Sequence, residues 1–322
     1  MTRVFATVIA TLLAGAFSTA LLAQDYPSRE IRSICNFAPG SGADIIVRFY
    51  SDKLAKLAGK PVIVENKPGA NGAIATGDLA RAKPDGHSIM ITPASSTIAA
   101  APYLFKNLPF DTNKDFQAVT TIASLSFVLM VDASKPIKNV QELVAHLKTR
   151  PNHGFYGTSN NTGVIAAELF KQAAGLQTTY APYKANTQAL TDLLQGTVDF
   201  LSYDATWAAG QVKGGRVRVI AATAAKRSVA FPDVPTLGEL GFGKNDVTPW
   251  WGVAVPAGTP RPIVERLSGW FNQITSEEDT KQFLARAAFD PFPGSPDQMS
   301  ALLKSDAARW KRYVELAKIE PQ

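Results

Sequence analysis

Phe37-Ala38-Pro39-Gly40-Ser41-Gly42-Ala43-Asp44 joins two segments of different hydrophobic periodicity. The run before it, residues 31–37, is typical of a buried strand. The apolar residues after it recur with a helical period: Ile46, Phe49, Tyr50, Leu54 and Leu57. The stretch is therefore predicted to be a loop that ends at the start of a helix.

The chemistry of this loop suits an anion. Gly40 and Gly42 are predicted to take positive φ and to let a ligand approach the backbone. The N–H groups of the following first turn have no partner within the helix, and such a helix end attracts negative charge. Asp44 has two interpretations: a solvated carboxylate stabilised by the helix dipole, which is the commoner arrangement, or a carboxylate that faces the ligand through a water or an ammonium group.

The chain has 322 residues, enough for two domains of about 150 residues each. Residues 1–23 resemble a secretory signal peptide, because Arg3 precedes the apolar run 4–15 and small residues follow it. Cleavage after Ala20 or after Ala23 fits equally well. No later apolar run approaches the roughly 18 residues that a membrane span needs, so the mature protein is predicted to be exported and soluble.

Charge and cysteine content exclude several classes of function. The formal net charge is +6, and removal of residues 1–23 takes away Arg3 alone and leaves +5. Basic residues are spread among acidic ones, so we expect small anions rather than nucleic acid as partners. Cys35 is the single cysteine and cannot form an internal disulfide. Since no histidine lies near it in sequence, it is predicted to be a buried structural thiol rather than a nucleophile.

A pattern of strand, loop and helix recurs along the first part of the chain. Strands are predicted at 62–64 and 88–92, followed by the loops 68–72 and 93–97 and by helical stretches. Repetition of this unit predicts a parallel sheet whose loops gather at the carboxyl ends of the strands. That edge is the expected ligand site.

The pattern then repeats in a second lobe. The apolar run 122–131 is predicted to cross between lobes, and 250–255 to return. A second polar loop, 157–163, lies before a helix that runs to Ala173, and further strands are predicted at 179–183, 198–203 and 217–222. The predicted fold is α/β, with one lobe of residues 24–123 and 250–322 and another of 124–249. The last helix, from Ser295, is expected to pack on the first lobe.

Signatures of catalysis are missing. The sequence has no G-x-S-x-G, G-x-x-x-x-G-K-[ST], H-E-x-x-H or C-x-x-C motif, and only three histidines. We therefore expect no metal or other cofactor. What remains is a pair of donor-rich loops, each before a helix, which predicts backbone binding of a small carboxylate in a cleft. A secreted hydrolase is the rival interpretation and would need a histidine in that cleft.

Ordered motifs along nearly the whole mature chain resemble one family. The resemblance begins at Tyr26-Pro27 and at the loop Phe37 to Asp44, where Ser41 replaces a glycine. The other motifs are Val64-Glu65-Asn66-Lys67-Pro68-Gly69-Ala70, Leu108-Pro109-Phe110-Asp111, Tyr156-Gly157-Thr158-Ser159, Pro182-Tyr183-Lys184, Ala189-Leu190-Thr191-Asp192-Leu193-Leu194, Ala225-Lys226-Arg227-Ser228, Pro232-Asp233-Val234-Pro235-Thr236 and Pro256-Ala257-Gly258-Thr259-Pro260. The chain is similar to the Bug family, the extracytoplasmic solute receptors of tripartite tricarboxylate transporters.

The resemblance implies a type II periplasmic binding-protein fold, in which two α/β lobes with mixed, mostly parallel sheets and helices on both faces close on a ligand. It implies a periplasmic, monomeric, non-enzymatic protein that passes a dicarboxylate, tricarboxylate, acidic amino acid or aromatic acid to membrane permease subunits. A receptor that presents its ligand to a sensor kinase would share the same residues. The ligand-binding positions carried over from the family are Phe37, Ala38, Pro39, Gly40, Ser41, Gly42, Ala43, Asp44, Ser95, Ser96, Thr97, Thr158, Ser159, Asn160, Asn161 and Asp204.

The sequence departs from the family pattern at positions that bear on ligand choice. Ile98 and Ala101 stand where the family usually has a histidine and an asparagine, and Ala185 replaces a glycine. The loop 157–163 is about two residues shorter than usual and lacks a histidine. These differences predict a less polar rim, suited to a longer or an aromatic carboxylate.

Overall fold

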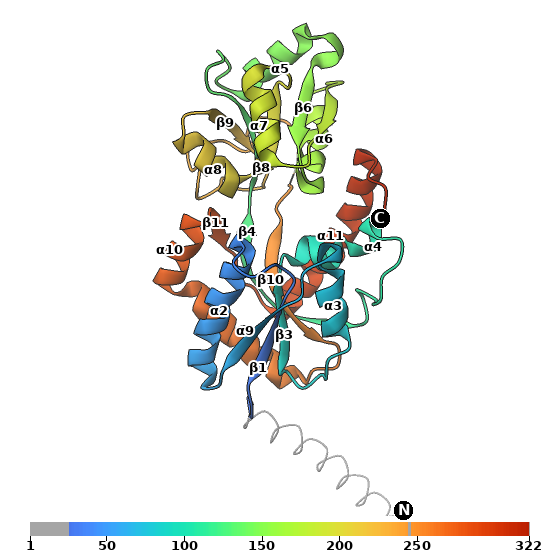
Figure 1. Cartoon of the computed structure of the whole chain (residues 1–322), viewed down its shortest axis with the longest axis vertical. Coiled ribbons are helices and arrows are strands. Elements are labelled where there is room, and N and C mark those ends of the chain that lie inside the picture. The colour runs from blue at the N-terminus through green and yellow to red at the C-terminus, as the bar shows by residue number, and fades with distance from the viewer. Residues whose placement is uncertain (1–25, 244–245, 322) are drawn as a thin grey trace, which may run out of the picture. The chain divides into compact units, whose positions relative to one another are not determined.

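A computed structural model describes residues 26–243 and 246–321 (Figure 1). The predicted signal peptide, residues 1–23, lies outside the described residues. Contacts divide the chain into two compact units. The first contains the chain to Ile122 with Trp251–Ser276 and Pro293–Asp306, and the second contains Ala123–Trp250, Glu277–Phe292 and the chain from Ala307. The lobe boundaries given above stay a prediction.

The first sheet has six strands in the order β11-β4-β10-β3-β1-β2. Its bounds are β1 Ile31–Cys35, β2 Val62–Asn66, β3 Ser88–Thr92, β4 Phe116–Leu125, β10 Trp250–Pro256 and β11 Phe289–Pro291. β1 pairs in parallel with both β2 and β3, as the repeated pattern predicted, whereas β10 pairs antiparallel with β3 and β11 pairs antiparallel with β4. β2 lies at the edge of this sheet, and its Ile63 is 47% exposed.

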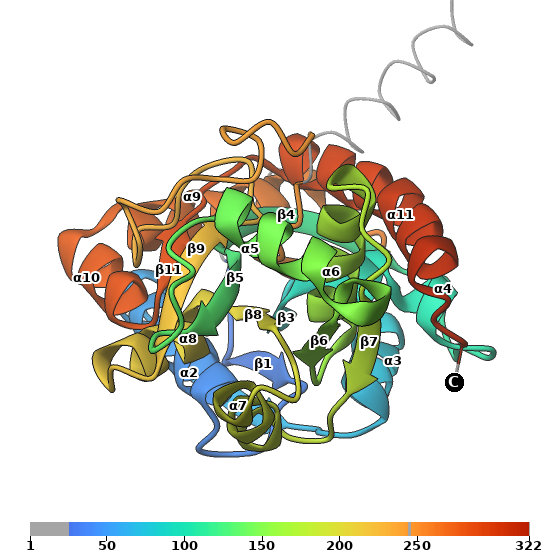
Figure 2. The same cartoon turned by 90° about the horizontal axis from the view of Figure 1, so that it is seen from above.

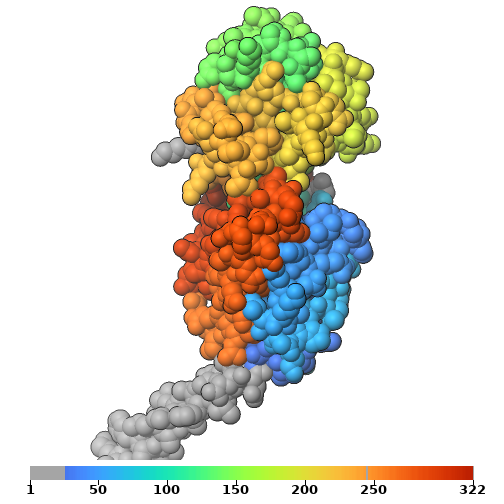
Figure 3. Space-filling model, turned by 90° about the vertical axis from the view of Figure 1, so that its left-hand side faces the viewer, coloured from blue at the N-terminus to red at the C-terminus, as the bar shows by residue number. Residues whose placement is uncertain are grey.

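Most helices of the first unit begin shortly after a strand ends. They are α2 Gly42–Ala58, the 3₁₀ turn η1 Ala70–Gly72, α3 Ala73–Ala80, the π turn η2 Ser95–Ala99, α4 Ala101–Leu104, α9 Arg261–Ser276 and the first half of α11 Pro296–Ala317. α2 buries Ile46, Tyr50 and Leu54, the centre of its predicted apolar stripe. Tyr50 stacks on Phe271 of α9 at 6.2 Å, and Figure 3 shows the blue surface of α2 beside the orange segment that contains α9.

The predicted crossing 122–131 is two strands rather than one. β4 ends at Leu125, Ser126 follows, and β5 Phe127–Asp132 begins a different sheet. Both strands are buried along most of their length, so the sequence reads as one continuous apolar run.

The second sheet has five strands in the order β7-β6-β8-β5-β9. The bounds are β6 Phe155–Thr158, β7 Thr179–Pro182, β8 Phe200–Asp204 and β9 Val217–Ala222. β6 is parallel to both β7 and β8, whereas β5 is antiparallel to β8 and β9. The carboxyl ends of β6 and β8 therefore meet at one edge.

Helices cover both faces of this sheet (Figure 2). They are α5 Val140–Thr149, the 3₁₀ turn η3 Pro151–His153, α6 Asn161–Ala173, α7 Asn186–Gln195 and α8 Ala205–Lys213, and α10 Glu278–Arg286 also belongs to this unit. One core gathers between the sheet and α5 and α6, another between the sheet and α7 and α8. The mixed α/β fold with helices on both faces is as predicted.

Helices α8 and α10 were not predicted from the sequence. In α8 only Ala205 and Ala208 are buried, and in α10 only Thr280 and Leu284, so neither carries an apolar stripe. The last helix, α11, begins with the capping pair expected from its sequence: Gln298 N donates to Ser295 Oγ (3.1 Å) and Ser295 N to Gln298 Oε1 (2.8 Å). It does not pack wholly on the first unit, because Tyr313 donates to Asp246 O in the second.

Within residues 26–243 and 246–321, no helix combines the length and hydrophobicity that a membrane-spanning helix needs.

Gly163, in the first turn of α6, tests how tightly that turn packs on the sheet. A Cβ there would overlap Thr158 Oγ1 and lie 2.6 Å from the backbone oxygen of Ser202. Gly163→Ala is expected to destabilise the protein by about 1–3 kcal/mol, since the sheet backbone cannot yield. Gly210→Ala in α8, where a Cβ meets nothing within 4 Å, is the control and should be neutral or stabilising. Thermal melts followed by circular dichroism measure both; an unchanged melting temperature for Gly163→Ala would contradict the packing.

Candidate functional site

The start of α2 presents two free backbone donors. Ser41 caps the helix, because its Oγ accepts from the amide of Asp44 at 3.2 Å. The amide of Ser41 itself donates to Ala38 O, and that of Gly40 to the Asp44 carboxylate. In the described part of the chain, the amides of Gly42 and Ala43 have no protein partner. They are therefore available to a ligand.

The two glycines of the loop differ from the prediction in one respect. Gly40 has φ of +78°, as expected, but Gly42 is already helical and has no positive φ. A Cβ added at Gly42 would meet nothing within 4 Å, so open space lies in front of the helix start. The lack of a side chain at Gly42 therefore leaves room for a ligand to reach the free amides. Gly42 is not required for the conformation of the turn.

Asp44 is not the solvated residue that the sequence favoured. Its side chain is 1% exposed and accepts from Gly40 N (2.8 Å), Arg48 Nε (2.8 Å) and Asn66 Nδ2 (2.7 Å). Burial raises the pKa of Asp44, but these hydrogen bonds outweigh burial and hold the pKa at about 2. Both carboxylate oxygens of Asp44 accept hydrogen bonds from the protein, so Asp44 stabilises the conformation of the loop instead of facing a ligand.

The end of β2 completes this support. Asn66 donates to Phe37 O (2.9 Å) as well as to Asp44, and it accepts from Arg48 at 2.8 Å. Cys35 is buried as predicted, with its thiol 3.8 Å from the Asp44 carboxylate, and burial raises the pKa of the thiol. Arg48 and Asn66 were not predicted as parts of the site. Arg48 follows Asp44 by four residues on the helix, a spacing that predicts an ion pair between them.

Most side chains of the second predicted segment of this unit, residues 95–97, are buried. Ser95 and Thr97 are buried, and the Ser96 hydroxyl donates to Pro93 O at 3.1 Å. Ile98 and Ala101, predicted to make a less polar rim, are each only 1% exposed. For Ile98 and Ala101 the rim prediction is wrong, because the π turn continues into α4 and directs both residues into the core. For Ala185, which is exposed, it stays a prediction.

The start of α6 repeats the arrangement of α2. Asn160 caps the helix by accepting from Gly163 N at 2.8 Å, while the described amides of Asn161 and Thr162 have no protein partner. The predicted loop 157–163 is shorter than expected, since the helix begins at Asn161. Thr158 is the buried last residue of β6, and Ser159 Oγ donates to Asn186 Oδ1 of α7 at 2.5 Å.

Asp204 closes the start of α8. It is the N-cap and accepts from Trp207 N at 2.9 Å, and Ala205 N donates to Ser126 O. Burial raises the pKa of Asp204. Its predicted contact with a ligand stays a prediction, whereas its capping role is clear.

Within each unit, the predicted residues gather at one sheet edge. In the first unit, 37–44 and 95–97 follow β1 and β3, which are parallel neighbours. In the second, 158–161 and 204 lie at the ends of β6 and β8, also parallel neighbours. Two of the three helix starts at these loops, α2 and α6, offer free amides.

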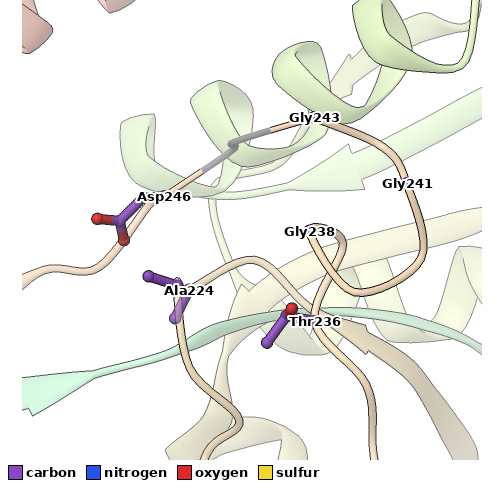
Figure 4. A pocket seen from close by; sticks show the side chains of 7 residues that line it. Ala224, Thr236, Gly238, Gly241, Gly243 and Asp246 are labelled. Carbon is purple, nitrogen blue, oxygen red and sulfur yellow. The ribbon is translucent and has the colours of Figure 1, made fainter.

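A cavity of about 580 Å³ lies elsewhere in the second unit, in the connector after β9 (Figure 4). Its lining includes Ala224, Thr236, Gly238, Gly241, Gly243 and Asp246. No predicted site residue lines it, and the Asp246 carboxylate is already paired with Arg309 at 3.2 Å. Among the residues that the structure describes, no three His, Cys, Asp or Glu side chains gather as a metal site.

Comparison with known proteins identifies the family. The sequence profile described as "Tripartite tricarboxylate transporter family receptor" matches residues 46–319. The chain belongs to this family. Membership confirms the Bug-type resemblance, and this receptor is accordingly a solute-binding protein and not an enzyme. Receptors of the family are periplasmic.

Three relatives illustrate the similarity. A protein of the UPF0065 group from Bordetella bronchiseptica is 32% identical over 98% of this chain and 93% of its own. The structure of R. palustris Rpa4515 with adipate is 29% identical with a TM-score of 0.75 and covers 92% of this chain and 100% of its own. MatC from Rhodopseudomonas palustris with bound malate is 26% identical with a TM-score of 0.69, over 90% and 100%.

The Asp44 network predicts a specific acid response of the receptor. Because the folded-state pKa lies below the ordinary value, the ionised carboxylate stabilises the fold above about pH 4, and this contribution is lost as pH falls toward 2. Asp44→Asn is expected to melt roughly 3–8 °C lower at pH 7, with the gap to wild type narrowing between pH 4 and pH 2. Asp52→Asn, an exposed change on the same helix, should follow the wild-type curve. Equal melting temperatures for Asp44→Asn and wild type at pH 7 would refute the network's role.

Proposed function

We propose that this receptor binds carboxylate groups at helix starts with free amides, those of Gly42 and Ala43 at α2 in the first unit and those of Asn161 and Thr162 at α6 in the second. The observation that carries the proposal is the shared construction of the two helix starts. In each, a side-chain cap takes the third amide of the helix and leaves the first two free. Two adjacent N–H groups at a helix N-terminus suit the two oxygens of a carboxylate.

The remaining predicted residues then divide by role. Ser41 and Asn160 cap, Asp44 fixes the first loop, and Phe37 supports that loop by stacking on Trp251 at 5.6 Å. No arginine clamp is needed for the ligand, since the donors are backbone groups. Adipate and malate, the ligands of the two solved relatives, are dicarboxylates and support this ligand class.

Partner and location follow from the family. The proposed route is export to the periplasm after removal of residues 1–23, capture of the acid by a monomeric receptor, and delivery to the permease subunits of a tripartite tricarboxylate transporter. The family description supports this route.

Thermal shift and isothermal titration of the purified protein against malate, succinate, adipate, citrate, aspartate and benzoate test the proposal. At least one acid should raise the melting temperature and bind with a measurable Kd. Gly42→Leu should keep the unliganded melting temperature, because its side chain meets open space, but should weaken binding by about tenfold or more by covering the free amides. Gly269→Leu in α9, an exposed helical glycine with open space around its Cβ, is the matched control and should bind as wild type.

Two results would count against the proposal. One is a protein that no acid of the panel stabilises. The other is Gly42→Leu that binds as tightly as wild type, which would put the ligand elsewhere.

A further inference from the structure

Four exposed basic side chains gather at one end of the second sheet and are called the basic patch below. They come from the loop between β5 and α5, from the end of α8 and from the turn after it: Lys135, Lys138, Lys213 and Arg216. The two segments are adjacent, because Asp132 pairs with Val217 in the sheet and Ala133 N donates to Arg216 O at 3.1 Å. They lie far apart in the sequence, so the charges form no basic run there.

The basic patch and the candidate site lie at opposite edges of the second sheet. β5 begins at Phe127, which pairs with Asp204 at the edge where α6 and α8 start. It ends at Asp132, beside the basic patch, and six residues of extended strand span about 17 Å. A surface bound to the basic patch would therefore leave the free amides of α6 uncovered.

The backbone that carries the basic patch is held in one conformation by Arg218 of β9. Its guanidinium donates to Ala133 O (3.1 Å), Ile137 O (2.6 Å) and Lys135 O (3.3 Å). The loop after β5 is thereby tied to the strand that follows Arg216. These bonds use backbone carbonyls and no carboxylate, so the guanidinium adds a further positive charge beneath the loop.

The acidic side chains nearest to this loop in the sequence are bonded elsewhere. Asp132 is 5% exposed and accepts from the amide and the hydroxyl of Ser134, each at 2.8 Å. Glu142 accepts from Lys138 N (2.6 Å) and from Asn139 Nδ2 (2.9 Å), which are groups of the helix cap. Within residues 26–243 and 246–321, none of the four basic side chains forms an ion pair. The basic patch therefore keeps a net positive charge.

The side chains of the basic patch suit a diffuse anionic surface. Three of the four are lysines, which are point charges on flexible stems and lack the fork with which arginine grips one carboxylate or phosphate. Clusters of four to eight such residues are typical of binding to anionic phospholipids. Val212, 37% exposed beside Lys213, adds an apolar side chain of the kind that enters a lipid interface. The family description names a transporter, and transporters lie in membranes, so such a surface is within reach.

We propose that the basic patch holds the receptor reversibly at an anionic phospholipid surface, with the ligand-binding edge of the second sheet left free. The attraction is electrostatic and therefore weak and sensitive to salt. This role goes beyond the proposed function and does not depend on which acid the receptor binds.

Flotation of the receptor, expressed without residues 1–23, with phospholipid vesicles tests the basic patch. The receptor should bind vesicles of phosphatidylglycerol and phosphatidylethanolamine but not vesicles of phosphatidylcholine. Raising the salt from about 20 mM to about 500 mM shortens the Debye length from about 20 Å to about 4 Å and should abolish binding. A quadruple variant should bind the anionic vesicles about tenfold more weakly or worse. It carries Lys135→Gln, Lys138→Gln, Lys213→Gln and Arg216→Gln.

A second quadruple variant, in the first unit, is the control and changes the net charge by the same amount. It carries Lys56→Gln, Lys60→Gln, Lys83→Gln and Lys106→Gln, all at exposed positions, and should bind anionic vesicles as wild type does. Both variants should keep the wild-type melting temperature, because every replaced side chain is exposed. Any acid that binds wild type should bind the patch variant with the same Kd, since the basic patch lies at the opposite edge of its sheet.

Three results would overturn the proposal. Equal weakening in the two quadruple variants would reduce the effect to net charge. A receptor that does not bind anionic vesicles at low salt would have no affinity for such a surface. Binding only to vesicles that contain the permease subunits would make an acidic protein the partner instead of the lipid.

Discussion

The burial of one carboxylate organises the first ligand loop. Asp44 has almost no contact with solvent, and a lone buried charge would cost several kcal/mol. Arg48 supplies the opposite charge, while Asn66 and the amide of Gly40 supply further hydrogen bonds. These donors come from the helix, the neighbouring strand and the loop itself. The carboxylate can be satisfied only when all three are in place, so the loop is fixed before a ligand arrives.

Fixing the loop matters because the proposed donors are backbone groups. Backbone amides bind an anion well only if the chain is held in one conformation, since ordering it on binding would reduce the affinity. α2 and α6 share a polar cap on the third amide of the helix, which leaves the first two amides without a protein partner in the described structure. The start of α8 differs. There Trp207 N donates to the Asp204 side chain and Ala205 N donates to Ser126 O, so the Asp204 carboxylate already occupies the helix N-terminus. At this edge of the second sheet, the start of α6 therefore has free amides and the start of α8 does not.

Sequence patterns predicted what depends on local periodicity. The parallel strands β1 and β3, the loop after β1 and the helix after it are set by neighbouring residues, and all were predicted. The family resemblance supplied Thr158 to Asn161, which periodicity alone would have placed only in a polar loop. The role of Asp44 was missed because its partner Asn66 lies 22 positions away, on a strand whose pairing with β1 no local pattern reveals. Ile98 and Ala101 were misjudged for a similar reason: a family difference shows that a residue changed, but not which way its side chain points.

The central proposal is that the free backbone amides at the two helix starts, those of Gly42 and Ala43 in α2 and those of Asn161 and Thr162 in α6, bind carboxylate groups of the ligand. A ¹H–¹⁵N NMR titration of the labelled protein with a carboxylate that stabilises it observes these groups directly. The account predicts that these four amide protons shift downfield together and saturate at one Kd. Shifts concentrated instead in the connector around Thr236 to Gly243, with the four amides unmoved, would contradict it.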